Sequence, residues 1–171
     1  MKQFAYRVIY NSQINYVLRN INKLLLPILP AKIKLPPSGT IKMLNPNSKP
    51  FKMRTNQTNY LTQLIFWNGG YKNFEYTPIF LDIIKDMDTF FDIGANIGLY
   101  SLIAANENPK IQVVGFEPAV GPLYYFTQNV EINGFKNIRI EPIALSHKNG
   151  EIEFFEMKNP KYKYLKFNLS G

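Results

Sequence analysis

The stretch from Thr89 to Leu99, TFFDIGANIGL, constrains the fold more than any other part of the sequence. Phe90, Phe91 and Ile93 are typical of a parallel strand that is buried on both faces. After two glycines, the run LYSLIAA has the composition of a helix. We therefore predict a buried strand, a tight turn and the first turns of a helix.

The turn between Gly94 and Gly98 indicates a ligand site. A helix that begins there presents free backbone N–H groups, and glycine lets a ligand approach the main chain closely. Asp92 stands just before the turn, where a carboxylate repels a phosphate and attracts an ammonium group. The pattern therefore favours a ligand with both an amine and a carboxylate, such as the methionine end of S-adenosylmethionine.

Helices and strands alternate around this turn, which predicts a right-handed parallel α/β sheet. Upstream, we expect a helix over 60–67 that stops at Asn68-Gly69-Gly70, and a second from the N-cap Thr77 to Asp88. Downstream, we expect a helix, a strand, a helix and two strands: Leu99–Asn106, Ile111–Phe116, 122–132, Asn137–Leu145 and Glu151–Met157.

The first 50 residues are predicted to be an N-terminal extension and linker, followed by the main domain over residues 51–171. Met1–Asn22 has a loose helical period, and short strands are expected at Thr40–Leu44 and Phe51–Thr55. The apolar run Leu24–Pro30 is too short to span a bilayer. It is either a weak membrane-surface contact, aided by Lys23, Lys32 and Lys34, or a connector packed on the domain; we favour the connector.

Composition limits the classes of function. The 171 residues carry a net charge of +8, but the basic residues are scattered singly, which does not favour nucleic-acid binding. The chain has no cysteine, which excludes disulfides, a cysteine-based zinc site and a thiol nucleophile, and fits a cytoplasmic protein. The single His147 lies in a predicted turn, SHKNG, and cannot form a histidine-rich metal site.

Glu117 gives the second indication of a ligand site. It follows the next predicted strand, 25 positions after Asp92, so both carboxylates should lie where ligands bind to parallel sheets. A carboxylate there can accept hydrogen bonds from ribose hydroxyls. The turn lacks the G-x-G-x-x-G pattern of dinucleotide-binding proteins. Taken singly, the glycines could merely shape the turn, Asp92 could cap the helix and Glu117 could be a surface carboxylate.

Over residues 59–157 the chain resembles the FkbM-type methyltransferases, which have the fold of class I S-adenosylmethionine-dependent enzymes. The resemblance rests on FDIGANIGLYSLIAA, VVGFEP, Asn129 with Asn133-Gly134, and NIRIEPIALS with Gly150. It implies a Rossmann-like parallel sheet with S-adenosylmethionine as the cofactor. The implied cofactor-binding residues lie in the turn, after the next strand and near the adenine: Asp92, Gly94, Ala95, Asn96, Gly98, Glu117, Pro118 and Ala144.

The resemblance also implies a fourth strand with an acidic D-x-E-G-like motif, which this sequence does not contain. We therefore expect a sheet that is incomplete at the C-terminus, either because the sequence is a fragment or because a partner completes it. His147 and Tyr100 are weak candidates for a general base.

The expected function is methyl transfer to a hydroxyl of a sugar, glycan or natural product, so the partner would be a small-molecule or glycan substrate. Four alternatives remain open. These are a non-catalytic cofactor-binding remnant, a nucleotide-dependent oxidoreductase, a basic protein that binds RNA or an anionic membrane, and an enzyme that methylates RNA.

Overall fold

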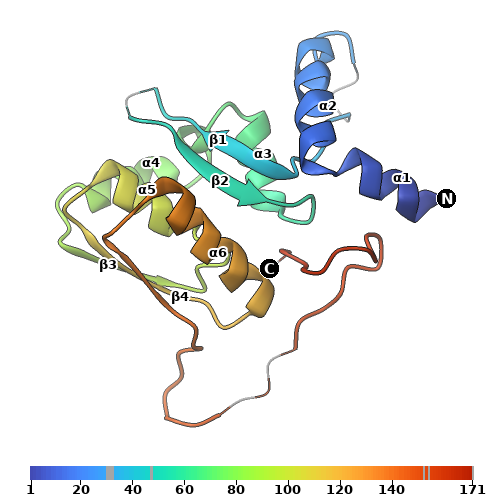
Figure 1. Cartoon of the computed structure of the whole chain (residues 1–171). Coiled ribbons are helices and arrows are strands. Elements are labelled where there is room, and N and C mark those ends of the chain that lie inside the picture. The colour runs from blue at the N-terminus through green and yellow to red at the C-terminus, as the bar shows by residue number, and fades with distance from the viewer. Residues whose placement is uncertain (30–32, 47, 152, 154, 171) are drawn as a thin grey trace.

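The computed structural model describes residues 1–29, 33–46, 48–151, 153 and 155–170. Two sheets organise this part of the chain (Figure 1). An antiparallel hairpin joins β1 (Gly39–Met43) to β2 (Phe51–Thr55), and a parallel sheet has the order β3-β4-β5.

The parallel sheet has the predicted alternation of strands and helices, and it confirms the α/β, Rossmann-like fold class. Asp92 pairs with Gly115 in the β3–β4 register, so the ends of the two strands meet at one edge. The strands and their crossover helices are β3 (Thr89–Ile93), α5 (Leu99–Glu107), β4 (Gln112–Phe116), α6 (Val120–Asn133) and β5 (Ile138–Glu141).

The prediction that both faces of β3 are buried is wrong. Phe90 packs against Phe80 of α4 (Thr77–Ile84), with ring centroids 5.1 Å apart. Phe91 and Ile93 are 59% and 68% exposed, because alternate side chains of a strand point to opposite faces and the helix-covered face is the one that carries Phe90. An apolar composition gave no indication of which face the helices cover.

The hairpin belongs to the main hydrophobic core. Ile41, Met43, Phe51 and Met53 are all buried there. Both of its strands match the predicted ones within a residue. The two strands of the hairpin lie on either side of residue 50, the predicted boundary between the N-terminal extension and the domain. This boundary stays a prediction.

The two helices before β3 differ from each other in how well the sequence predicted them. The predicted helix over 60–67 is α3 (Tyr60–Trp67), and the short 3-10 helix η1 (Tyr71–Asn73) follows it. The second, α4, begins at Thr77 itself with Tyr76 as the N-cap, and it ends at Ile84 rather than Asp88. A proline near the first position fixed the start of the helix without a side-chain cap.

The chain after β5 is mostly irregular. The strand predicted to reach Leu145 ends at Glu141, and the described residues of the segment 151–157 form no strand; Ile152 and Phe154 lie outside the described residues. The chain then runs back to the hairpin side of the molecule (Figure 1), where Tyr162 and Leu169 are buried.

At the N-terminus, α1 (Lys2–Ile9) and α2 (Ser12–Leu25) precede the hairpin. The run Leu24–Pro30, predicted as a connector packed on the domain, is packed only in part: Leu24 at the end of α2 and Ile28 are 78% and 82% exposed, whereas Leu26 and Leu29 are half-buried. Pro30 lies outside the described residues. No helix in the described part of the chain is both long and apolar enough to cross a membrane.

Candidate functional site

The turn after β3 folds onto the end of β4. The N–H groups of Gly94 and Ala95 both donate to the carbonyl oxygen of Phe116, at 2.9 and 3.0 Å. Gly94, Asn96 and Gly98 have φ values of 75°, 51° and 83°, in the left-handed region. The backbone of this turn therefore lies directly at the carboxyl ends of two neighbouring strands.

Glu117 joins the turn to the start of α6. Its Oε2 accepts a hydrogen bond from the Asn96 N–H at 2.7 Å, and its Oε1 accepts one from the Ala119 N–H at 2.8 Å. The side chain is buried, and it is positioned from both sides by backbone groups. A carboxylate can accept about four hydrogen bonds, so each oxygen keeps capacity for a ligand hydroxyl.

Asp92 is held by the first turns of α5. Its Oδ2 accepts hydrogen bonds from the Ser101 N–H at 3.0 Å and the Ser101 hydroxyl at 2.6 Å. Burial raises the pKa of the Asp92 carboxyl, and the two hydrogen bonds from Ser101 oppose the rise. The negative charge of Glu117 raises the pKa of Asp92 further, so the two carboxylates are close enough to interact.

The two glycines of the turn have different roles. A Cβ at Gly98 would overlap the ring of Phe126 and crowd Leu102, so this glycine is required for packing. A Cβ at Gly94 would meet no atom within 4 Å. The open space over Gly94 is where a ligand can approach the main chain.

A pocket of about 340 Å³ opens at this edge of the sheet. Of the residues predicted from the sequence, Gly94, Asn96 and Glu117 line it. Five of its lining residues come from the C-terminal segment, which forms the other wall: Phe155, Glu156, Met157, Asn168 and Ser170.

The other five predicted residues, Asp92, Ala95, Gly98, Pro118 and Ala144, do not line this pocket. Ala95 lines a neighbouring pocket of about 310 Å³, together with Asn96. Pro118 is half-buried beside Glu117. Ala144 lies in the exposed segment after β5, as does His147, and neither lines the two pockets at the turn.

Sequence reasoning missed Asn59 as a residue that supports the site. Its Nδ2 donates to Asn96 Oδ1 at 3.2 Å and to the Leu169 carbonyl at 3.3 Å, while its Oδ1 caps α3 through the Thr62 N–H. Its position before a helical run was a signal for the cap but not for the contact with the turn.

The C-terminal segment was also missed. Leu169 N–H donates to Thr58 Oγ1 at 2.7 Å, and Glu156 Oε1 accepts from the Gly121 N–H at 3.1 Å, near the start of α6. No periodicity or motif in this segment indicated that it returns to the glycine turn.

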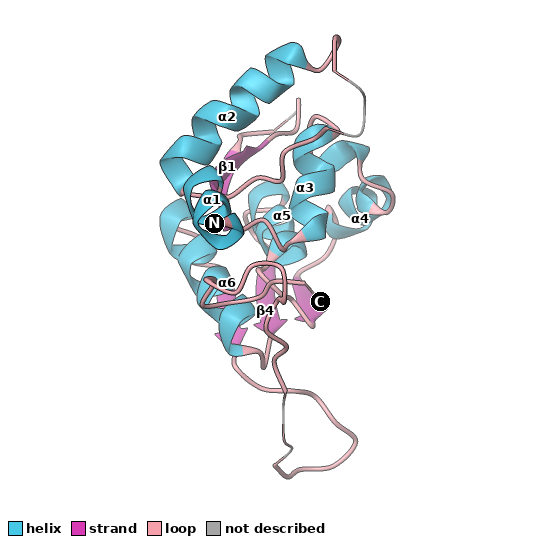
Figure 2. Cartoon of the chain, turned by 90° about the vertical axis from the view of Figure 1, so that its right-hand side faces the viewer, coloured by secondary structure: helices cyan, strands magenta, loops and turns pink. Residues whose placement is uncertain are grey.

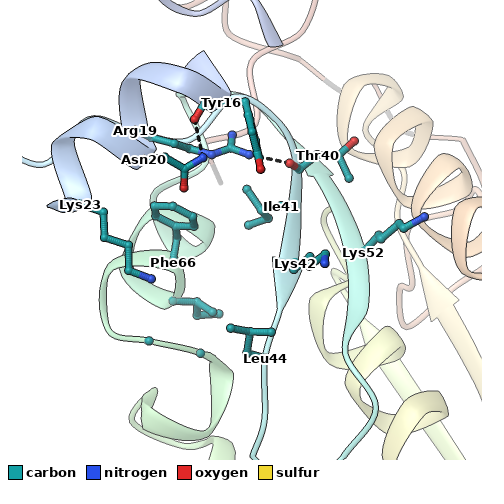
Figure 3. A pocket seen from close by; sticks show the side chains of 13 residues that line it. Tyr16, Arg19, Asn20, Lys23, Thr40, Ile41, Lys42, Leu44, Lys52 and Phe66 are labelled. Atoms are coloured by element: carbon teal, nitrogen blue, oxygen red, sulfur yellow. Dashed lines mark hydrogen bonds between the residues drawn. The ribbon is translucent and has the colours of Figure 1, made fainter. Parts of the chain in front are cut away.

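A second pocket, of about 330 Å³, lies between α2, β1 and α3 and shares no lining residue with the first (Figure 3). Lys23, Lys42, Lys52 and Arg19 line it, and no Asp or Glu does. Among the described residues, no group of three or more His, Asp or Glu side chains could hold a metal ion.

The fold and the position of the pocket define the general structural class of the chain. This is a Rossmann-like α/β chain with a polar pocket at the carboxyl ends of β3 and β4, where such sheets bind ligands. No protein-family profile matches the chain.

Two curated proteins show sequence similarity. The 31-O-demethyl-FK506 methyltransferase FkbM of Streptomyces tacrolimicus is 33% identical over 91 residues, which cover 48% of this chain and 35% of that protein. The uncharacterized protein MJ1452 of Methanocaldococcus jannaschii is 31% identical over 58 residues, 34% of this chain and 22% of that protein. The chain thus spans about a third or less of the length of these relatives.

Solved structures with some likeness carry the names of methyltransferases. A SAM-dependent methyltransferase from Agrobacterium tumefaciens is 14% identical, with a TM-score of 0.41 over 61% of this chain and 32% of that one. A precorrin-6y C5,15-methyltransferase from Geobacter metallireducens is 20% identical, with a TM-score of 0.36 over 39% and 36%. The resemblance to FkbM-type methyltransferases inferred from the sequence motifs is confirmed by the S. tacrolimicus relative.

Proposed function

We propose that this chain forms the cofactor-binding part of an S-adenosylmethionine-dependent methyltransferase. The observation that carries the proposal is the placement of Glu117. Its carboxylate is buried at the end of β4, held by the Asn96 and Ala119 N–H groups, and lines a pocket beside the open face of Gly94.

The groups around the pocket fit the parts of this cofactor. Glu117 provides acceptors for the two ribose hydroxyls, and the open backbone at Gly94 allows the amino-acid end to approach. The pocket volume of about 340 Å³ is within the range of small-molecule sites, at its lower end. The position of Ala144 in an exposed segment leaves the adenine contact as a prediction.

The cofactor would supply an activated methyl group for transfer to a substrate hydroxyl oxygen, and a base would take the hydroxyl proton. The contribution of this chain would be to hold the methyl donor in a fixed orientation, which is the main source of rate in such transfers. Glu156 is the second carboxylate that lines the pocket. The residue that accepts the proton stays unassigned.

The proposed acceptor is a hydroxyl of a sugar, glycan or natural product. The name of the Streptomyces tacrolimicus relative states an oxygen of FK506 as its acceptor, which supports oxygen over nitrogen or carbon. The cytoplasmic location expected from the sequence stays a prediction.

Calorimetric titration of the purified chain with S-adenosylhomocysteine tests the proposal, with NAD as the control. We expect saturable binding of S-adenosylhomocysteine and none of NAD. Binding of NAD alone would favour an oxidoreductase. A folded chain that binds neither would contradict the proposed cofactor site.

A further inference from the structure

Helix α2 has its polar side turned inward and its apolar side turned outward. The buried residues of the helix are Asn15, Arg19 and Asn22. Asn15 and Arg19 bond to Ser38, just before β1: Asn15 Oδ1 accepts from the Ser38 N–H at 2.8 Å, and Arg19 donates to the Ser38 carbonyl at 2.9 Å. Arg19 also donates to the carbonyl of Thr40 in β1 at 2.7 Å (Figure 3).

These contacts fix the rotation of the helix. Asn22 adds two more, since it donates to the Ile33 carbonyl at 2.9 Å and accepts from the Leu35 N–H at 2.8 Å. Because the three polar residues follow one another at helical spacing, they hold one side of α2 against residues 33–40 along most of its length. The neighbouring side is thereby left facing outward.

The outward side carries an apolar stripe, defined here as Ile14, Val17, Leu18, Ile21 and Leu25. These side chains are 36–54% exposed and have the i, i+3, i+4, i+7 and i+11 spacing of one helix face. Both views of the molecule place α2 at its edge, with β1 on the inner side (Figures 1 and 2). Monomeric soluble proteins rarely expose a continuous apolar surface of this kind unless it contacts a partner.

The distribution of charge selects the partner. Residues 1–74 contain eleven Lys or Arg and no Asp or Glu, whereas residues 75–171 contain nine Lys or Arg and all twelve acidic residues. The whole positive excess of the chain therefore lies in the part that carries the stripe. In the described residues the two ion pairs, Lys85–Asp82 and Arg139–Glu141, both lie in the other part.

A second copy of this chain is a poor partner for the stripe. Pairing two stripes would bring two segments without any acidic residue together, and like charges oppose such contact. A nucleic acid matches the charge but offers no acyl chains to the apolar residues. An anionic bilayer provides both a negative surface and an apolar layer just beneath it.

We propose that α2 docks the chain on an anionic membrane surface, with the stripe inserted at the boundary between headgroups and acyl chains. Lys34 lines the same groove as Leu18, Ile21 and Leu25 of the stripe, where it can reach lipid phosphates. The long stem of this lysine lets its charged end stay at the headgroup level. Such a location would bring the pocket at the glycine turn to substrates held at the membrane; the docking itself does not depend on the proposed methyl transfer.

Co-sedimentation of the full chain with vesicles tests the proposal. We expect binding to vesicles of phosphatidylcholine with about one third phosphatidylglycerol, and much weaker binding to phosphatidylcholine alone. Raising NaCl from about 0.1 to about 1 M should weaken binding, since the Debye length falls from about 10 to about 3 Å.

Two matched pairs of variants distinguish insertion of the stripe from nonspecific adsorption of the protein to vesicles. Leu18→Ser with Ile21→Ser should lower vesicle binding by about tenfold or more, because two partly inserted apolar side chains are lost. Ile79→Ser with Ile83→Ser, on exposed positions of α4, should leave it unchanged. Lys34→Glu should lower binding more than Lys110→Glu, which changes an exposed lysine in the other part of the chain.

Circular dichroism checks that each variant keeps its helices. Equal vesicle binding by the wild type and the Leu18→Ser, Ile21→Ser variant would overturn the proposal. So would a dimer in vesicle-free solution that the same variant dissociates, since the stripe would then be covered by a second copy. Failure of the chain to bind anionic vesicles would overturn it whether or not S-adenosylhomocysteine binds.

Discussion

At the scale of single residues, Glu117 both shapes the site and lines it. One carboxylate holds the glycine turn and the start of α6 through the Asn96 and Ala119 N–H groups, and also lines the pocket. A change at this position therefore acts on ligand binding and on the position of Asn96 together.

We predict that Glu117→Gln weakens the binding of S-adenosylhomocysteine by about tenfold to a hundredfold. The amide keeps the shape but loses charge-assisted hydrogen bonds, which contribute about 1.5–3 kcal/mol. Calorimetry of the variant beside Glu131→Gln, an exposed carboxylate on α6, gives the comparison. Equal affinity in both variants would remove Glu117 from the cofactor site.

A second prediction concerns Asp92 and pH. Because burial raises its pKa above the ordinary value of 3.8, the native state binds the proton more tightly than the unfolded chain does. The stability linked to this proton is present below the unfolded pKa and is lost as pH rises through the raised native pKa. Asp92→Asn keeps an acceptor for Ser101 and has no charge to desolvate.

The free energy of unfolding of Asp92→Asn, relative to wild type, should therefore increase between pH 3 and pH 7. Urea denaturation at several pH values measures it, with the exposed Asp86→Asn as the control. A difference that stays constant over this range would contradict the raised pKa.

At the scale of elements, two asparagines of α6 replace a strand partner for β2. Asn129 accepts from the Arg54 N–H at 2.6 Å and donates to the Arg54 and Ile97 carbonyls at 3.2 and 3.0 Å. One turn later, Asn133 exchanges two hydrogen bonds of 2.7 Å with the backbone of Lys52. The edge of the hairpin is thus paired with helix side chains, and the two sheets are joined through α6.

We predict that Asn129→Leu lowers the free energy of unfolding by about 2–4 kcal/mol. Leucine fills a similar volume but leaves the partners of a fully buried amide unpaired, at about 1–3 kcal/mol for each buried group. Asn133→Leu should cost less, since its contacts with Lys52 are near solvent. Urea denaturation of both variants tests the order, and a larger loss at Asn133 would refute it.

The sequence predicted those elements whose local pattern agrees with their surroundings. The strand–turn–helix around Gly94 and Gly98, the crossover helices and the hairpin strands were all indicated by composition and turn residues. The exposed face of Phe91 and Ile93 was not, because a strand sequence cannot tell which face neighbouring helices will cover. The sequence also provided no indication that α2 buries its polar side and exposes its apolar side, because the apolar side of a helix is ordinarily the buried one.

At the scale of the whole molecule, the C-terminal segment connects parts that are far apart in sequence. Tyr164 donates to the Tyr6 carbonyl at 3.1 Å, and Gln57 donates to the Tyr164 hydroxyl at 2.7 Å. Leu169 is buried in the main core, beside the glycine turn. Sequence reasoning could not find these contacts, because they depend on single residues without periodicity.

We predict that Leu169→Ala lowers the free energy of unfolding by about 2–4 kcal/mol, the usual cost of truncating a buried leucine. It should also raise amide exchange in residues 94–98. Loss of the leucine side chain loosens the segment that carries the Leu169 carbonyl, and Asn59 bonds both to that carbonyl and to Asn96. Hydrogen exchange measured by mass spectrometry provides the test. Leu165→Ala, at a half-buried position of the same segment, is the control and should leave exchange at the turn unchanged.

The distance in sequence between Asn59 and its partner Leu169, 110 residues, has a consequence for synthesis of the protein. The N-terminal part leaves the ribosome first, and α1, α2 and the hairpin have contacts with one another within the first 55 residues. The pocket at the glycine turn, however, has a wall that is made from residues 155–170. A nascent chain would therefore acquire α2, the proposed membrane-docking helix, well before it acquires the complete lining of the proposed cofactor pocket.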